Sequence, residues 1–175
     1  MKFVKKLRVN APAGKVWKVF AHDFDRAYEW MASVPNSYGK ANGKLFEGAK
    51  SAGRVCELNS DPKGLKAFEQ FLDYDESKKT CTVRIDFVNT PIVFPVDHNA
   101  VRFSVVDIGE NQSELTWAFG SQIKPWAFVI WPFIRIGFGV FIGQIAEELK
   151  YFVEHDAPHP RKVRAINKMA TVSRA

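Results

Sequence analysis

Histidine and carboxylate side chains are the groups in this sequence that could bind a metal ion or transfer protons. His155 and His159 are four residues apart, but the prolines that flank His159 prevent the helical geometry needed to aim both rings at one ion. His22 stands near Asp23 and Asp25, which could bind a cation, although a polar junction between two helices is the favoured interpretation. No spacing matches a known metal motif, so the sequence predicts neither a metal nor a cofactor.

Asp97 and His98 form the one pair in the sequence that suggests acid–base catalysis. A carboxylate close to an imidazole could tune a general base. Adjacent residues of an extended strand point to opposite faces, however, so the two side chains are not expected to bond to each other. His98 is therefore a weak catalytic candidate, and no other residue is assigned a catalytic role.

Several arginines could anchor a ligand that carries a carboxylate. Arg84 and Arg102 each alternate with apolar residues along a strand-like segment, and the favoured interpretation places both in solvent. Arg54 and Arg135 are further candidates. Arg135 is notable because its surroundings are so apolar, although an arginine that extends to the surface is the favoured account of it.

Large aromatic residues occur throughout the chain and could line a cavity as well as fill a core. The predicted ligand-binding set joins Arg54 and Arg135 to eight aromatic residues, namely Trp17, Trp30, Phe68, Phe87, Phe103, Trp117, Phe138 and Phe141. The alternative interpretation is that these aromatic side chains only form the core.

The elements that must position these residues begin with one strand and two short helices. Residues 2–9 alternate apolar and charged side chains, as a half-buried strand does. Apolar spacing between Val16 and Met31 indicates two short helices that stop near Pro35. Strand-like segments with turn sequences between them follow at residues 38–46, 53–59, 65–74, 80–88, 100–107 and 113–120. The pattern predicts an antiparallel meander.

The stretch from Trp126 to Glu154 is predicted to form one long helix. Its second half spaces apolar residues three and four apart, with charged residues on the opposite face. Its first part, up to Ala146, is about as long as the roughly 20 residues that a bilayer helix requires. Pro132 should bend or break it, and Arg135 would cost about 2.5–3.5 kcal/mol at mid-bilayer. A soluble helix on a sheet is therefore the favoured interpretation, and a membrane span is the alternative.

Length and composition favour one domain with a sizeable core. Most of the net charge of +6 lies after Asp156, and the balanced body has no basic stripe with interleaved aromatics, so no nucleic-acid partner is expected. Residues 1–156 are predicted to form the domain, and residues 157–175 a basic, partly disordered tail. Cys56 and Cys81 are expected to be buried thiols. The start MKFVKKLRVN lacks a secretory signal, so a cytoplasmic location is expected.

Several motifs, in their order along the chain, resemble the SRPBCC superfamily, which includes the START and Bet v 1-like proteins. APAGKVWKVF at residues 11–20 is similar to the superfamily's signature after the first strand, and Gly53-Arg54-Val55 is similar to its entry into the third strand. Further similarities lie in Phe24-Asp25, Trp30, Val34-Pro35, Leu115-Thr116-Trp117 and residues 143–154. The resemblance spans about residues 1–154.

The resemblance implies an α+β helix-grip fold, in which a curved antiparallel sheet of about six or seven strands wraps around a long C-terminal helix, with two short helices after the first strand. It also implies a cavity between sheet and helix that binds a lipid, a fatty acid or a polyketide-like molecule. One alternative is an enzyme similar to the polyketide cyclase/dehydrase members. Another is an interaction module, in which Trp126–Phe133 contacts a membrane or a second copy in a homodimer. Residues 126–138 are more apolar and more interrupted than the superfamily pattern, which suits either a lid over the cavity mouth or such a surface.

Overall fold

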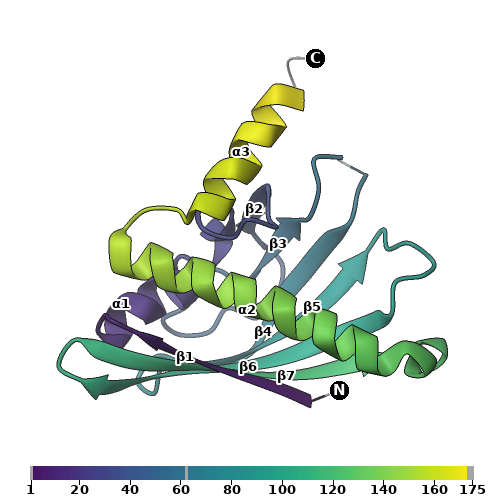
Figure 1. Cartoon of the computed structure of the whole chain (residues 1–175). Helices are drawn as coiled ribbons and strands as arrows, with labels where there is room; N and C mark the ends of the chain where they lie inside the picture. Colours follow the sequence, from purple (N-terminus) through teal and green to yellow (C-terminus); the bar gives the residue numbers. More distant parts are fainter. Residues whose placement is uncertain (1, 62, 173–175) are drawn as a thin grey trace.

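The protein is described by a computed structural model that covers residues 2–61 and 63–172. A seven-stranded antiparallel sheet curves around one long helix (Figure 1). The strands are β1 (Lys2–Val9), β2 (Asn36–Gly39), β3 (Gly53–Glu57), β4 (Lys66–Asp75), β5 (Thr80–Val88), β6 (Val96–Gly109) and β7 (Gln112–Ile123). Their order is β1-β7-β6-β5-β4-β3-β2, so β1 pairs with the last strand and the remaining neighbours are consecutive in the chain.

Helical segments lie at the two ends of this sheet and across its concave face. After β1, α1 (Ala13–Trp17) continues into the π-helical turn η1 (Lys18–His22), and the 3-10 segment η2 (Phe24–Glu29) follows. The 3-10 segment η3 (Pro125–Ile130) leads into the long helix α2 (Trp131–His155). Pro132 lies in the first turn of α2, where a missing N–H breaks no helical bond, so it begins the helix and does not bend it. The predicted helix-grip fold is confirmed.

Two predicted strands differ most from the structure in their bounds. The strand expected at residues 38–46 is only the short β2, because a loop follows in which Gly43 and Gly48 have φ of 141° and 84°. Such positive φ values favour glycine and do not occur in a regular strand. The strand expected at residues 100–107 begins at Val96, directly after Pro95, so that proline precedes the sheet pairing and does not interrupt it.

The end of the chain is more ordered than predicted, because residues of the expected tail form helix α3 (Pro160–Val172), which projects from the domain (Figure 1). Its first turn is tied to the body. Lys162 is 1% exposed and donates a hydrogen bond to the backbone oxygen of Val34 at 2.8 Å. The sequence did not show this contact because Val34 lies 128 residues away. Arg174, which belongs to the same basic segment, lies outside the described residues.

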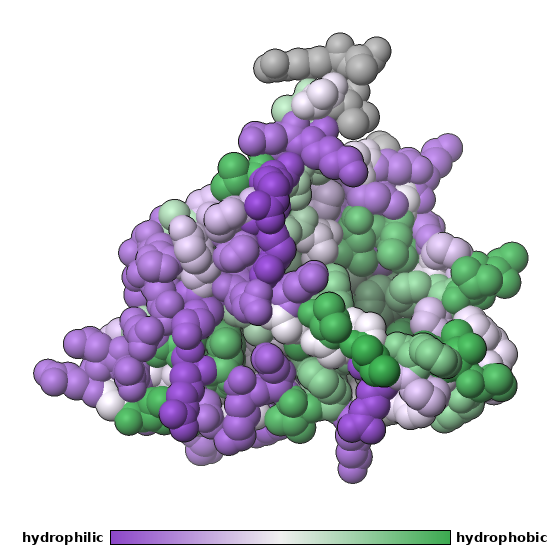
Figure 2. Space-filling model, in the orientation of Figure 1, coloured by the Kyte–Doolittle hydropathy of each residue, from purple (hydrophilic) through white to green (hydrophobic). Residues whose placement is uncertain are grey.

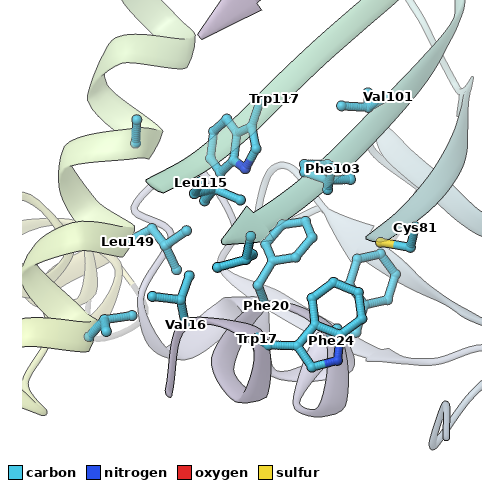
Figure 3. Packing of buried hydrophobic residues seen from close by; sticks show 14 of the residues in the cluster. Val16, Trp17, Phe20, Phe24, Cys81, Val101, Phe103, Leu115, Trp117 and Leu149 are labelled. Carbon is cyan, nitrogen blue, oxygen red and sulfur yellow. The ribbon is translucent and has the colours of Figure 1, made fainter. Parts of the chain in front are cut away.

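The hydrophobic core fills the space between sheet and helix at the end where α1 and η1 lie (Figure 3). The rings of Phe20 from η1 and Phe103 from β6 have centroids 4.2 Å apart. Leu149 from α2 and Val16 from α1 are fully buried in the same cluster. Burying such a side chain contributes about 1.5–3 kcal/mol, so this end is the firmly packed part of the molecule.

By length and composition alone, the segment Pro125–His155 could cross a membrane. The two halves of the segment differ in the structure. Its C-terminal half buries Ile145, Leu149 and Val153 in the core. Its N-terminal half exposes large apolar side chains, among them Phe133. Because half of the helix is part of the domain core, the structure favours a helix that belongs to the fold over one that spans a bilayer.

Candidate functional site

A cavity of about 500 Å³ lies beside this core, between the sheet and the first half of α2. This volume is within the range of small-molecule sites. Its walls come from the inward faces of strands β3 to β7, from residues 30–34, from the β5–β6 connection and from one face of α2. That face consists of Ile134, Gly137, Phe138, Phe141, Ile142 and Ile145, which recur at helical spacing.

Most of the predicted ligand-binding residues lie on the wall of this cavity. They are Trp30, Arg54, Phe87, Phe103, Trp117, Phe138 and Phe141. Phe103 and Trp117 also belong to the core cluster, and their rings meet edge to face at 5.8 Å. The cavity and the core therefore share residues where they meet.

Trp17, Phe68 and Arg135 lie away from the cavity, contrary to the predicted set. Trp17 is buried at the opposite end of the core, where its indole N–H donates to Glu76 at 2.9 Å. Phe68 points to the outer face of the sheet because Ala67 and Glu69, its neighbours along β4, point inward. Arg135 is exposed on the solvent side of α2, as its favoured interpretation predicted.

His98 also lies outside the cavity. It is paired across the sheet with Asp86 and Gln122, on the face opposite to the cavity. The expectation that it would not bond to Asp97 is wrong, since its Nδ1 lies 2.8 Å from the Asp97 carboxylate. The register shifts between Val96 and His98, and this irregularity breaks the strict alternation on which the expectation depended.

A buried ion pair crosses the wall of the cavity between β3 and β4. Arg54 and Glu69 are directly opposite in the register, and their side chains meet at 2.9 Å. Arg54 also donates to the backbone oxygen of Phe24 at 2.9 Å, and its guanidinium lies 4.1 Å from the centre of that ring. Burial, reinforced by the negative charge of Glu69, raises the pKa of the nearby Cys56 thiol to about 12. Cys56 is therefore a neutral thiol near neutral pH.

Glu69 and Asn99 are polar cavity residues that the sequence interpretation missed. Each occupies an inward position in a strand whose other inward positions are apolar, such as Phe71 in β4 and Val101 in β6. For Asn99 in β6, this break in the alternation is a signal that the sequence does contain. Phe20 and Phe119 were also missed, because Phe20 was interpreted only as part of a motif and Phe119 only as part of a strand.

Four buried polar atoms on the cavity wall have no hydrogen-bond partner within residues 2–61 and 63–172. They are Ser33 Oγ, Arg54 Nε, Asn99 Oδ1 and Trp117 Nε1. Most buried polar atoms of folded proteins are paired, so such a concentration needs an explanation. All four residues line the cavity, so a bound molecule is the remaining source of a partner for these atoms.

One wall of the cavity is held in place by α2 and α3. The backbone N–H of Ala32 donates to the buried Glu148 at 2.9 Å, and Arg161 donates to the other oxygen of that carboxylate. Lys162 holds the oxygen of Val34, as described above. Because Ser33 and Val34 line the cavity, these contacts fix the position of its wall.

His22 forms a polar contact with the turn after β4, and not the junction between two helices that was favoured over a cation site. Its Nε2 lies 2.9 Å from both carboxylate oxygens of Glu76, which also accepts hydrogen bonds from Trp17 and Tyr74. Asp23, one of its predicted partners, instead pairs with Lys50. Within the part of the chain that the structure describes, no group of three histidine, cysteine, aspartate or glutamate residues could hold a metal ion. Cys56 and Cys81 are both free and buried, as predicted.

A large exposed apolar surface surrounds the beginning of α2. We call it the apolar collar, and it consists of Ile92, Val93, Trp126, Phe128, Val129, Phe133 and Ile136. Ile92 is 94% exposed on the β5–β6 connection, and Phe133 is 77% exposed on α2. Figure 2 shows hydrophobic side chains at this end of the molecule, on the right of the view. The collar adjoins the cavity, because the collar residues Val93 and Phe133 are followed in the chain by Phe94 and Ile134, which line the cavity.

The sequence matches the profile of a family described as polyketide cyclase / dehydrase and lipid transport over residues 1–151. No curated protein matches it significantly. A START superfamily protein from Mycobacterium smegmatis has a TM-score of 0.67 at 15% identity, over 87% of this chain and 97% of that one.

Norcoclaurine synthase from Thalictrum flavum also resembles the structure, with a TM-score of 0.58 at 15% identity, over 89% of this chain and 87% of that one. The protein Ara h 8.0201 has a TM-score of 0.60 at 13% identity, over 87% and 97%. At these identities the likeness to solved structures shows the fold alone.

Proposed function

Since the chain belongs to the polyketide cyclase/dehydrase and lipid transport family, within the SRPBCC superfamily, we propose that it binds a hydrophobic small molecule in the cavity beneath α2. The cavity itself is the observation that carries the proposal. Its wall is built mainly from aromatic and aliphatic side chains, with few polar groups. A lipid, a fatty acid or a polyketide-like compound has the apolar surface to match it, and each Å² of such surface removed from water contributes about 25 cal/mol.

A related fold supports a ligand of this size. Norcoclaurine synthase from Thalictrum flavum has been solved in complex with dopamine and hydroxybenzaldehyde, which are small aromatic molecules. The proposed location is the cytoplasm, where a reducing environment suits two buried free thiols.

Two glycines of α2 provide a matched test of this proposal. A Cβ atom added at Gly137 or at Gly143 would meet no atom of a neighbouring element within 4 Å, but only Gly137 lines the cavity. We expect Gly137→Phe to weaken binding of the apolar dye N-phenylnaphthylamine at least several-fold, and Gly143→Phe to leave it unchanged. Equal binding by both variants, or saturable binding by neither variant nor the parent protein, would contradict a ligand site in this cavity.

A cyclase or dehydrase activity would require a group that transfers protons within the cavity. The ionisable pair there, Arg54 and Glu69, is already joined, and both oxygens of Glu69 have partners in Arg54 and Cys56. His98 lies on the other face of the sheet. Binding without chemistry is therefore the function that the geometry supports best.

The apolar collar supports a second proposed role, contact with the surface of an anionic membrane. Exposed apolar surfaces of this kind mark interaction sites. Residues 124–146 carry Lys124 and Arg135 but no aspartate or glutamate, which suits anionic lipid headgroups. The collar adjoins the cavity, so a protein that lies on the membrane in this way would hold the cavity close to the lipids.

Vesicle flotation tests this second role. We expect the protein to float with vesicles of phosphatidylcholine and phosphatidylserine, and Phe133→Glu to reduce flotation strongly. Leu72→Glu is the matched control, because Leu72 is 52% exposed on β4, away from the collar. Equal flotation of the two variants would contradict a role of the collar. A concentration-dependent dimer that Phe133→Glu dissociates would instead assign the collar to a homodimer.

A further inference from the structure

The strand register places the buried polar residues of the sheet in one line across its concave face. Arg54 is opposite Glu69, Glu69 is opposite Ile85, Ile85 is opposite Asn99, and Asn99 is opposite Ser121. Directly opposite residues of neighbouring strands point to the same face. Arg54, Glu69, Asn99 and Ser121 are all buried, and we call them the polar row.

The neighbouring rows on this face are apolar. Ala67 and Phe87 lie opposite each other on the side that leads to the β5–β6 connection. On the other side, the next row consists of Phe71, Val83, Val101 and Phe119. The cavity therefore has a polar band across its middle and apolar surface towards both ends.

Two members of the polar row line the cavity and each has one buried polar atom without a partner among the described residues. Arg54 and Asn99 are each 5% exposed, both line the cavity, and Arg54 Nε and Asn99 Oδ1 lack a partner among the described residues. Glu69, by contrast, is satisfied by Arg54 and Cys56. An unpaired buried polar atom destabilises a fold, and an apolar residue at position 99 would avoid that cost. A polar side chain at this place is therefore explained by a ligand that bonds to it.

We propose that Asn99 is a specificity-determining residue, whose side chain binds a hydroxyl group on an otherwise apolar ligand. This inference depends on the proposed binding function and narrows its ligand class. Strands are about 4.8 Å apart, so the backbones of β3 and β6 are roughly 14 Å apart, and Arg54 and Asn99 contact different parts of the ligand. The ligand class is then an oxygenated hydrocarbon with a hydroxyl group near β6 and an oxygen acceptor near β3, and not a plain alkyl chain.

Pyrene and hydroxypyrene test this inference, because the two fluorescent probes differ by one hydroxyl group. The protein should bind hydroxypyrene about 5- to 10-fold more tightly than pyrene, which corresponds to one hydrogen bond of about 1 to 1.4 kcal/mol. Asn99→Leu has a similar size but no polar atom, and it should abolish this preference. Asn99→Asp retains an acceptor and should retain the preference.

Stability provides a second readout that does not depend on the probes. Because Asn99→Leu removes an unpaired buried atom, the variant should unfold at the same or a higher temperature than the parent protein. A preference that survives in Asn99→Leu, or no preference in the parent protein, would overturn the role of Asn99 and leave the proposed binding function intact. Failure of the parent protein to bind either probe would overturn both, so the two failures are distinguishable.

Discussion

Removal of one member of the Arg54–Glu69 pair should destabilise the protein more than removal of both. Glu69→Leu leaves the Arg54 charge buried at 5% exposure without its carboxylate partner, although the contacts of Arg54 with Phe24 remain. Breaking a buried pair in this way costs about 3–5 kcal/mol. For a chain of this length, each kcal/mol lowers the melting temperature by about 2–4 °C, so a loss of 3 kcal/mol lowers it by roughly 6–12 °C.

The double variant Arg54→Met, Glu69→Leu should be much closer to the parent protein. Replacing a buried pair with apolar residues is neutral or stabilises by about 1–4 kcal/mol. Against this, the backbone oxygen of Phe24 loses the hydrogen bond from Arg54, which costs about 1–3 kcal/mol. Taken at the middle of each range, about 2 kcal/mol, the two effects cancel, so the double variant is expected to be close to the parent in stability.

Urea unfolding followed by tryptophan fluorescence measures these differences as shifts of the transition midpoint at constant slope. The single variants and the double variant together form a double-mutant cycle, which isolates the coupling energy of the pair. A Glu69→Leu variant that unfolds within about 1 kcal/mol of the parent would refute the reasoning. A double variant no more stable than Glu69→Leu would refute it as well.

Three further predictions concern the core, the thiols and α3. Leu149→Ala removes a fully buried side chain and should cost about 2–5 kcal/mol in urea unfolding, whereas Val140→Ala, 58% exposed on the same helix, should change stability by less than about 0.5 kcal/mol. Cys56 and Cys81 should resist iodoacetamide at neutral pH in the native protein and react in urea, because burial raises the pKa of both thiols; rapid native labelling would contradict their burial. Burial lowers the pKa of Lys162 below its usual 10.5, so the folded state binds its proton less readily than the unfolded state does. Relative to Lys162→Met, the parent protein should therefore gain stability as the pH rises towards 10.5, and a difference that does not change with pH would count against this burial.

The fold was readable from the sequence because its signals are local. Alternation along residues 80–88 predicts β5 with the bounds that the structure has, and helical spacing of apolar residues predicts α2. Turn residues predicted where the strands are connected. The order of the elements along the chain was compatible with few sheet topologies. The same alternation does not decide the faces of β4, because Ala67, Glu69 and Phe71 alternate with Phe68, Gln70 and Leu72, and each set contains two apolar residues and one polar residue.

The site was less readable because it depends on contacts between distant segments. The alternation along β6 includes Asn99 among the inward positions, but only the register shows that Arg54, Glu69 and Asn99 form one row. The register irregularity beside His98 is invisible in the residue pattern. Likewise, nothing near Lys162 in the chain indicates that its charge is buried against Val34.

The distance along the chain between Val34 and Lys162 also sets an order for folding during synthesis. Ribosomes add about 5–20 residues per second. Lys162, which lies 128 residues after Val34 and donates to its oxygen, is therefore synthesised roughly 6 to 26 seconds later than Val34. The pairing partner of β1 is also synthesised late, because Lys2 pairs with Gly120 in β7. During this interval α2 does not yet cover the inner face of the nascent sheet. The apolar residues of that face are therefore available to chaperones or to other nascent chains. The wall of the cavity is thus among the last parts of the molecule to form.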